Sequence, residues 1–103
     1  KKAVLELGGS DPFVVLDDAD VDQAVDTAIR SRFGNVGQTC VAAKRFILDQ
    51  RIADEFIHKL KERTARLTLG DPKDEATGMA PMARADLRTK LHDQVLKTID
   101  QGA

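Results

Sequence analysis

The chain has 103 residues, with 16 Lys and Arg against 17 Asp and Glu and a formal net charge of −1. Charges of both signs are mixed along the chain and no apolar run is long enough to cross a bilayer, which argues against nucleic acid or a membrane as a partner. The single cysteine cannot form an intrachain disulfide, so we expect a reducing compartment, the cytoplasm.

The first third of the chain predicts two strands and a helix. Residues 3–7, AVLEL, are mostly apolar and stop at a Gly-Gly pair, and residues 13–16, FVVL, form a short run rich in β-branched side chains. A helix over about 21–33 is predicted because Asp20 can act as its N-cap and apolar side chains then recur with helical spacing.

The rest of the chain continues the alternation. We expect a strand over 45–48, a helix over 51–67, a loop over 68–83 that holds two Gly and two Pro, and a last helix over about 84–101. Strands that alternate with helices in this way predict an α/β fold with some parallel pairing.

Cys40 is the first candidate for chemistry. It follows GNVGQT, six residues that fit neither a helix nor a strand, and Lys44 is the only Lys or His within a few residues of it. Free cysteine is often buried as a small apolar residue, which is one interpretation. The other is a nucleophile, because a thiol is strongly nucleophilic and glycines let backbone N–H groups approach a developing oxyanion.

Glu6 is the second candidate, because it lies between two leucines in LELGG. Strand alternation alone would direct its side chain to solvent. A partly buried carboxylate, in contrast, would suit a general base that acts on water.

The two histidines give weaker signals. His58 lies on the polar side of its predicted helix, whereas His92 lies beside an apolar stripe and is expected to be partly buried or at its edge. A Cys40–His92 dyad has no local sequence signature. The two histidines lack i,i+4 spacing and no CxxC motif is present, so the sequence predicts no metal site.

Two motifs together resemble the aldehyde dehydrogenase family. LELGGSDPFVVLDDADVDQAV is similar to the family's glutamate motif and FGNVGQTCVAAKRFIL to its cysteine motif, in the same order and with Glu6 placed 34 positions before Cys40. LTLGDPKDEATGMAPMA also resembles the loop after the cysteine region. The resemblance therefore covers essentially the whole chain, and it is nearest to the bacterial succinate-semialdehyde dehydrogenase branch.

The resemblance implies oxidation of an aldehyde to a carboxylate with NAD or NADP, succinate semialdehyde being a candidate substrate. Cys40 matches the residue that attacks the aldehyde carbon, and its own backbone N–H helps to hold the alkoxide. Glu6 matches the residue that activates the water for thioester hydrolysis. Leu7 matches a position against the nicotinamide end of the cofactor.

The resemblance also implies an architecture. Residues 1–9 match the end of a cofactor-binding domain, and residues 10–103 match the N-terminal part of a three-layer α/β catalytic domain. The family's oxyanion asparagine and nucleotide-binding residues have no counterpart here. We therefore expect a fragment, inactive alone, that works with the remainder of its own chain in a homo-oligomer.

Two positions depart from the succinate-semialdehyde branch. Some of those enzymes carry, six residues before the cysteine, an arginine that binds the substrate's far carboxylate, and this chain has Gly34 there. Some carry a redox-switch cysteine two residues after the first, where this chain has Ala42, so no such switch is expected. Two other readings stay open: a cysteine-dependent hydrolase or acyl-transfer enzyme, and a non-catalytic α/β interaction module with Cys40 buried.

Overall fold

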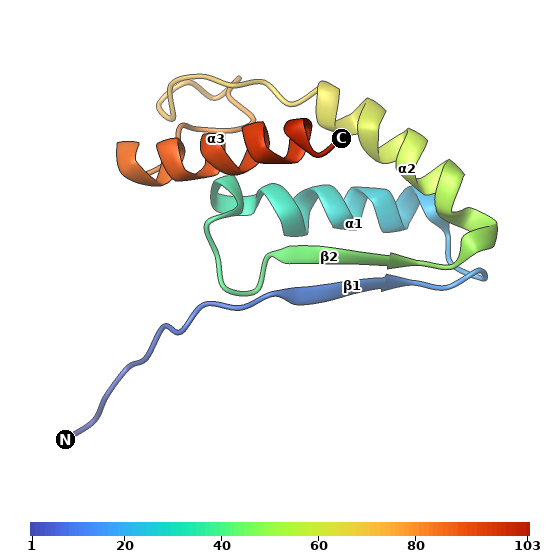
Figure 1. Ribbon diagram of the computed structural model, residues 1–103, viewed down its shortest axis with the longest axis horizontal. Helices are drawn as coiled ribbons and strands as arrows, with labels where there is room; N and C mark the ends of the chain where they lie inside the picture. The colour runs from blue at the N-terminus through green and yellow to red at the C-terminus, as the bar shows by residue number, and fades with distance from the viewer.

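The computed structural model describes every residue from 1 to 103 and contains a parallel strand pair with helices beside it (Figure 1). In chain order the elements are β1 (Asp11–Val15), α1 (Val21–Phe33), the 3-10 turn η1 (Gly34–Gly37), β2 (Ala43–Leu48), α2 (Gln50–Ala65) and α3 (Ala85–Asp100). The predicted α/β alternation is confirmed, and the two strands and three helices begin and end within two residues of their predicted bounds, while η1 is not among the predicted elements.

The sheet consists of β1 and β2, which pair in parallel with Val14 opposite Ile47. Parallel neighbours need a crossover connection, and α1 provides it. Helices α1 and α2 cover one face of the sheet (Figure 1). Val14 and Ile47 alternate with residues that pack in the core, so they lie on the other face, and they are 58% and 50% exposed. Within these residues the α/β fold therefore consists of a sheet and helices on one side of it.

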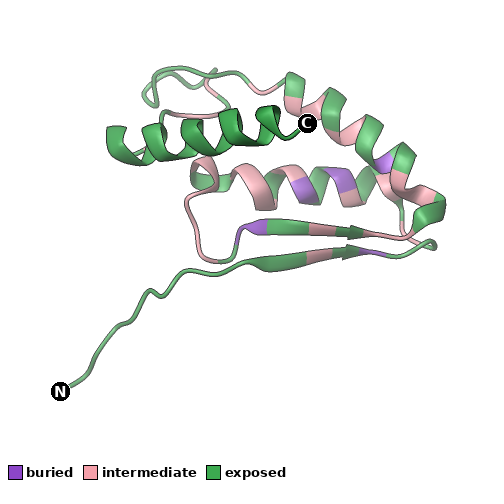
Figure 2. Ribbon diagram, in the orientation of Figure 1, coloured by how far each residue is buried: buried purple, intermediate pink, exposed green.

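A small apolar core joins the sheet to α1 and α2. Its buried members are Val15, Val25, Ala28 and Phe56, and Figure 2 shows buried segments on the strands, on α1 and on α2. The ring of Phe56 is part of an aromatic cluster with Phe13 and Phe46, in which the ring centroids are 5.5 to 6.4 Å apart. Tilted aromatic pairs at these distances add attraction beyond the area that they bury.

Polar contacts fix the start of α1. The side chain of Asp20 accepts a hydrogen bond of 3.0 Å from the backbone N–H of Gln23, which confirms the predicted N-cap. In the first turn of α1, Asp22 pairs with Lys59 and Arg63 of α2. The hydrogen bond from Lys59 lowers the pKa of the Asp22 carboxyl below its ordinary value, so these charges hold α1 beside α2.

The predicted strand over residues 3–7 is wrong. Residues 1–10 form an extended segment without regular structure that runs away from the sheet (Figure 1), and all of them are exposed. Val4 is 100% exposed and Leu7 86%. A strand needs a neighbour to accept its hydrogen bonds, and β1 and β2 pair only with each other.

Helix α3 lies beyond α1, on the side away from the sheet, and has no buried residue (Figures 1 and 2). Its apolar stripe faces open space, with Leu91 50% and Ile99 56% exposed. His92 is exposed rather than partly buried, because no other element covers this stripe. None of the helices combines the length and apolar character needed to span a membrane.

Candidate active site

Cys40 lies in the connection between η1 and β2, which the chain enters through an unusual backbone conformation. Asn35, Val36 and Gly37 have φ values of 50°, 59° and 71°, so three consecutive residues are left-handed. This conformation suits glycine but is strained for a β-branched residue such as Val36. Strain of this kind, about 1–3 kcal/mol, persists only where neighbouring contacts enforce it.

Those contacts come from the end of α1. Arg32 donates a hydrogen bond of 2.7 Å from Nη1 to the carbonyl of Ala43 and one of 2.8 Å from Nη2 to the carbonyl of Gly37. Ser31 Oγ accepts a bond of 3.2 Å from the N–H of Ala43. The last turn of α1 therefore fixes the residues on both sides of the segment 38–42, which we call the cysteine loop.

Only glycine fits where the cysteine loop begins. A Cβ at Gly37 would overlap the guanidinium of Arg32 and would lie 2.8 Å from the Arg32 carbonyl oxygen. The positive φ and this close approach both require that position 37 carry no side chain.

The cysteine loop borders a solvent-open hollow of about 580 Å³. Cys40 and Glu6 both line it, together with Thr39 and Lys44. The η1–β2 connection descends to the point where the N-terminal segment enters β1 (Figure 1), which brings these distant residues together. The two predicted catalytic side chains therefore share one space, which neither motif alone could establish.

The two side chains differ in burial. Cys40 is half-buried, which differs from the interpretation that it is a fully buried cysteine. Glu6 is exposed, which fits the interpretation that its side chain reaches solvent and differs from that of a partly buried carboxylate.

Free backbone donors accompany the thiol. The N–H groups of Thr39, Cys40 and Val41 donate to no acceptor within the chain. Unpaired N–H groups next to a nucleophile are the donors that stabilise an oxyanion in acyl chemistry. The cysteine loop thus combines a thiol with N–H groups that are free to bind a negatively charged oxygen.

The other predicted residues lie outside the hollow. Leu7 follows Glu6 but does not line it, and neither His58 nor His92 does. No group of three His, Cys, Asp or Glu side chains is placed to hold a metal ion. A hydrolase mechanism that needs a base near Cys40 would therefore have Glu6 as its only carboxylate there.

Sequence reasoning missed Arg32 as the residue that fixes the cysteine loop. An arginine in the last turn of a helix, just before a glycine-containing bend, is the signal that could have found it, since cations at helix C-termini bind exposed carbonyls. In the sequence Lys44 is only a cation near Cys40, because the sequence does not indicate which carbonyls its ammonium reaches.

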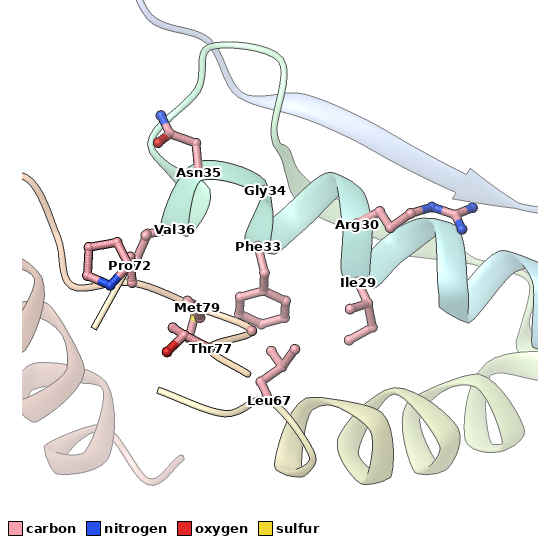
Figure 3. Close-up of a pocket in the computed structure, with 12 residues that line it drawn as sticks. Ile29, Arg30, Phe33, Gly34, Asn35, Val36, Leu67, Pro72, Thr77 and Met79 are labelled. Atoms are coloured by element: carbon pink, nitrogen blue, oxygen red, sulfur yellow. The ribbon is translucent and has the colours of Figure 1, made fainter. Parts of the chain in front are cut away.

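A second hollow of about 510 Å³ lies between the end of α1 and the loop that precedes α3. Figure 3 shows Ile29 and Phe33 directed toward Leu67 and Met79, while the guanidinium of Arg30 points away. No cysteine, histidine or carboxylate lines this hollow, so it offers no counterpart to the chemistry around Cys40.

Known proteins match the chain over its whole length. Residues 1–103 match the model of the aldehyde dehydrogenase family. The chain is 55% identical over 103 residues to succinate semialdehyde dehydrogenase Sad of Escherichia coli K12, whose name includes NAD(P)+, and it covers 22% of that protein. It is 48% identical to a probable NADP+ succinate-semialdehyde dehydrogenase of Synechocystis and covers 23% of it.

Solved structures agree in fold. Succinate-semialdehyde dehydrogenase from Burkholderia pseudomallei superimposes with a TM-score of 0.88 at 37% identity, over 95% of this chain and 20% of that one. Lactaldehyde dehydrogenase from Escherichia coli superimposes with a TM-score of 0.88 at 33% identity, over 94% of this chain and 20% of that one. The chain spans about a fifth of the length of the relatives that it matches, and it belongs to the aldehyde dehydrogenase family.

Proposed function

We propose that the protein containing this chain is an NAD(P)-dependent aldehyde dehydrogenase that oxidises an aldehyde to a carboxylate. The observation that carries the proposal is the hollow shared by Glu6 and Cys40, the central residues of the two family motifs. A nucleophile and a carboxylate in one space are the two side chains that a thioester route requires.

The first half of the proposed reaction belongs to Cys40. Its thiolate sulfur forms a bond to the aldehyde carbon, and the carbonyl π electrons move to the oxygen as an alkoxide. The N–H of Cys40, free of any acceptor in the chain, donates a hydrogen bond to that oxygen. Collapse of the alkoxide expels a hydride and leaves a thioester on Cys40.

NAD or NADP, when bound, supplies the acceptor for that hydride. Leu7 is the residue of this chain that would touch it, as an 86% exposed apolar side chain directly after Glu6. An exposed apolar group suits the face of a flat ring, so the residue present fits the nicotinamide end of the cofactor. The names of the Escherichia coli and Synechocystis relatives support this choice of cofactor.

The second half belongs to Glu6. Its carboxylate takes a proton from a water molecule, whose oxygen attacks the thioester carbon and displaces the Cys40 thiolate as the carboxylate product forms. Exposure of Glu6 to the hollow gives it access to water.

We propose succinate semialdehyde as the first aldehyde to test, because relatives at 55% and 48% identity carry that substrate in their names. This chain has Gly34 where some enzymes of that branch carry the arginine that binds the far carboxylate. The residue that would bind a second carboxylate is therefore not identified. A Cβ there would meet nothing within 4 Å, so position 34 borders free space. A panel with and without a second carboxylate will therefore decide the substrate class.

We further propose that residues 1–9 end a cofactor-binding domain and that residues 10–103 begin the catalytic domain. The start of β1 at Asp11 supports a boundary near this point. The full-length protein is proposed to be a cytoplasmic homo-oligomer that needs the remainder of its chain for activity.

The test uses the full-length protein and follows reduced nicotinamide by its absorbance, with NAD+ or NADP+ and a panel of aldehydes. We expect reduction by the wild type, none by Cys40→Ala, and strongly reduced turnover by Glu6→Gln. Thioester hydrolysis without any nicotinamide reduction would favour the cysteine hydrolase instead, and full activity in Cys40→Ala would reject the proposal.

A further inference from the structure

We propose that Lys44 is a positioning residue that joins residues 1–10, which we call the Glu6 segment, to the cysteine loop. Through this connection Lys44 controls hydrolysis of the Cys40 thioester. The inference rests on the proposed function, because it assigns a role to Lys44 within that reaction. Lys44 lies at the start of β2 and lines the same hollow as Glu6 and Cys40.

The ammonium group of Lys44 binds three backbone carbonyls. Its Nζ is 2.5 Å from the oxygen of Gly9, 3.3 Å from that of Cys40 and 3.4 Å from that of Thr39. A lysine has three N–H donors, so these carbonyls account for all of them. Lys44 makes no salt bridge with any carboxylate of the chain, which leaves the connection of these two segments as its visible role.

The two segments also touch directly at Gly9. A Cβ at this position would lie 2.8 Å from the Cys40 carbonyl oxygen, closer than real Cβ contacts allow. The backbone of the Glu6 segment can therefore approach the cysteine loop only because position 9 is glycine. The contact at Gly9 and the bonds of Lys44 are independent observations of the same junction.

Few other bonds hold the Glu6 segment. Residues 1–10 donate to or accept from the rest of the chain only at Gly9, through Lys44, and at Ser10, whose carbonyl accepts a bond of 3.1 Å from Arg45 Nε. The cysteine loop is different, because Arg32 fixes both of its ends from α1. Loss of the Lys44 ammonium should consequently free Glu6 while Cys40 stays in place.

This difference between the two segments predicts which step of the reaction becomes slower without Lys44. Attack by Cys40 and hydride loss need the cysteine loop, whereas hydrolysis needs Glu6 at a fixed distance from the thioester. Misplacement of a reacting group by about 1 Å costs about 100-fold in rate. Without Lys44 the acylated enzyme should therefore form at a normal rate and then persist.

The experiment compares full-length variants in two assays. Single-turnover formation of reduced nicotinamide reports acylation, and the intact mass of enzyme quenched during steady state reports the acyl adduct. Lys44→Met retains the apolar stem and removes the ammonium, and Gly9→Ala separates the segments by another route. Lys61→Met is the matched control, because Lys61 is exposed on α2 and its side chain makes no hydrogen bond or salt bridge.

We expect Lys44→Met and Gly9→Ala to keep the wild-type single-turnover rate, to lose about 10- to 100-fold in steady-state turnover, and to accumulate the acyl adduct. Glu6→Gln should give the same pattern, Lys44→Arg should restore turnover, and Lys61→Met should match the wild type. Unchanged turnover in Lys44→Met, or an equal fall in both rates, would overturn the inference. If Cys40→Ala and Glu6→Gln behave as proposed in that case, only the role of Lys44 is rejected; activity in Cys40→Ala would reject the proposed function itself.

Discussion

Replacement of Gly37 by alanine tests how the cysteine loop is held. Alanine at the φ of 71° costs about 1–2 kcal/mol more than a right-handed residue. Its Cβ would also displace the guanidinium of Arg32 from the Gly37 carbonyl. A hydrogen bond from a charged donor contributes about 1.5–3 kcal/mol, so the total penalty is about 2.5–5 kcal/mol.

A penalty of this size shifts the equilibrium between the observed loop and a rearranged loop by a factor of about 60 to 4,000. We therefore expect Gly37→Ala to lower single-turnover formation of reduced nicotinamide by the full-length enzyme at least about tenfold. Far-UV circular dichroism should show that the helices remain, because α1 and α2 pack through the core rather than through the loop.

Gly102→Ala is the matched control for backbone strain. Gly102 also has a positive φ, 97°, but a Cβ there would meet no neighbour within 4 Å, and it lies after α3, away from the hollow. Its single-turnover rate should equal that of the wild type. A wild-type rate in Gly37→Ala, or an equal loss in Gly102→Ala, would refute the argument that Arg32 and Gly37 together hold the cysteine loop.

Three further predictions follow from the packing and the charges. Phe56→Ala should lower the free energy of unfolding of the 103-residue chain in urea by about 3–5 kcal/mol, because Phe56 is fully buried. Ile57→Ala, at a position 55% exposed, should lower it much less. Equal losses would contradict the assigned core. Arg32→Met should lower the single-turnover rate of acylation, which Lys44→Met leaves unchanged, because Arg32 fixes the cysteine loop itself. A normal rate of acylation in Arg32→Met would contradict this prediction. Asp22→Asn should lower the urea midpoint of unfolding at neutral pH. The difference in midpoint from the wild type should become smaller below about pH 3.8, because Asp22, whose pKa is lowered in the fold, stabilises the fold only while its carboxyl is ionised. A constant difference down to about pH 2 would contradict this prediction.

The sequence was sufficient to predict the elements that carry a clear period or cap. The N-cap at Asp20 and the apolar spacing after it place α1 at its observed bounds, and the parallel strand pair follows from the alternation of strands with helices. The strand predicted over residues 3–7 is absent, because an apolar run indicates a tendency to form a strand but not the presence of a neighbouring strand to pair with.

The candidate site was predictable in its residues but not in its geometry. The motifs around Glu6 and Cys40 identify the side chains, while the hollow that they share depends on where the η1–β2 connection descends. The contacts of Arg32 and Lys44 go to backbone carbonyls, which every residue has, so no sequence pattern specifies them.

A trapped intermediate on Cys40 tests the central claim most directly. The Glu6→Gln variant of the full-length protein is mixed with NAD(P)+ and succinate semialdehyde, quenched with acid and digested, and the peptide that contains Cys40 is examined by mass spectrometry. The account predicts that this peptide carries the acyl group of the oxidised aldehyde and that one reduced nicotinamide forms for each acylated cysteine. Nicotinamide reduction with Cys40 unmodified, at a turnover equal to that of the wild type, would contradict it.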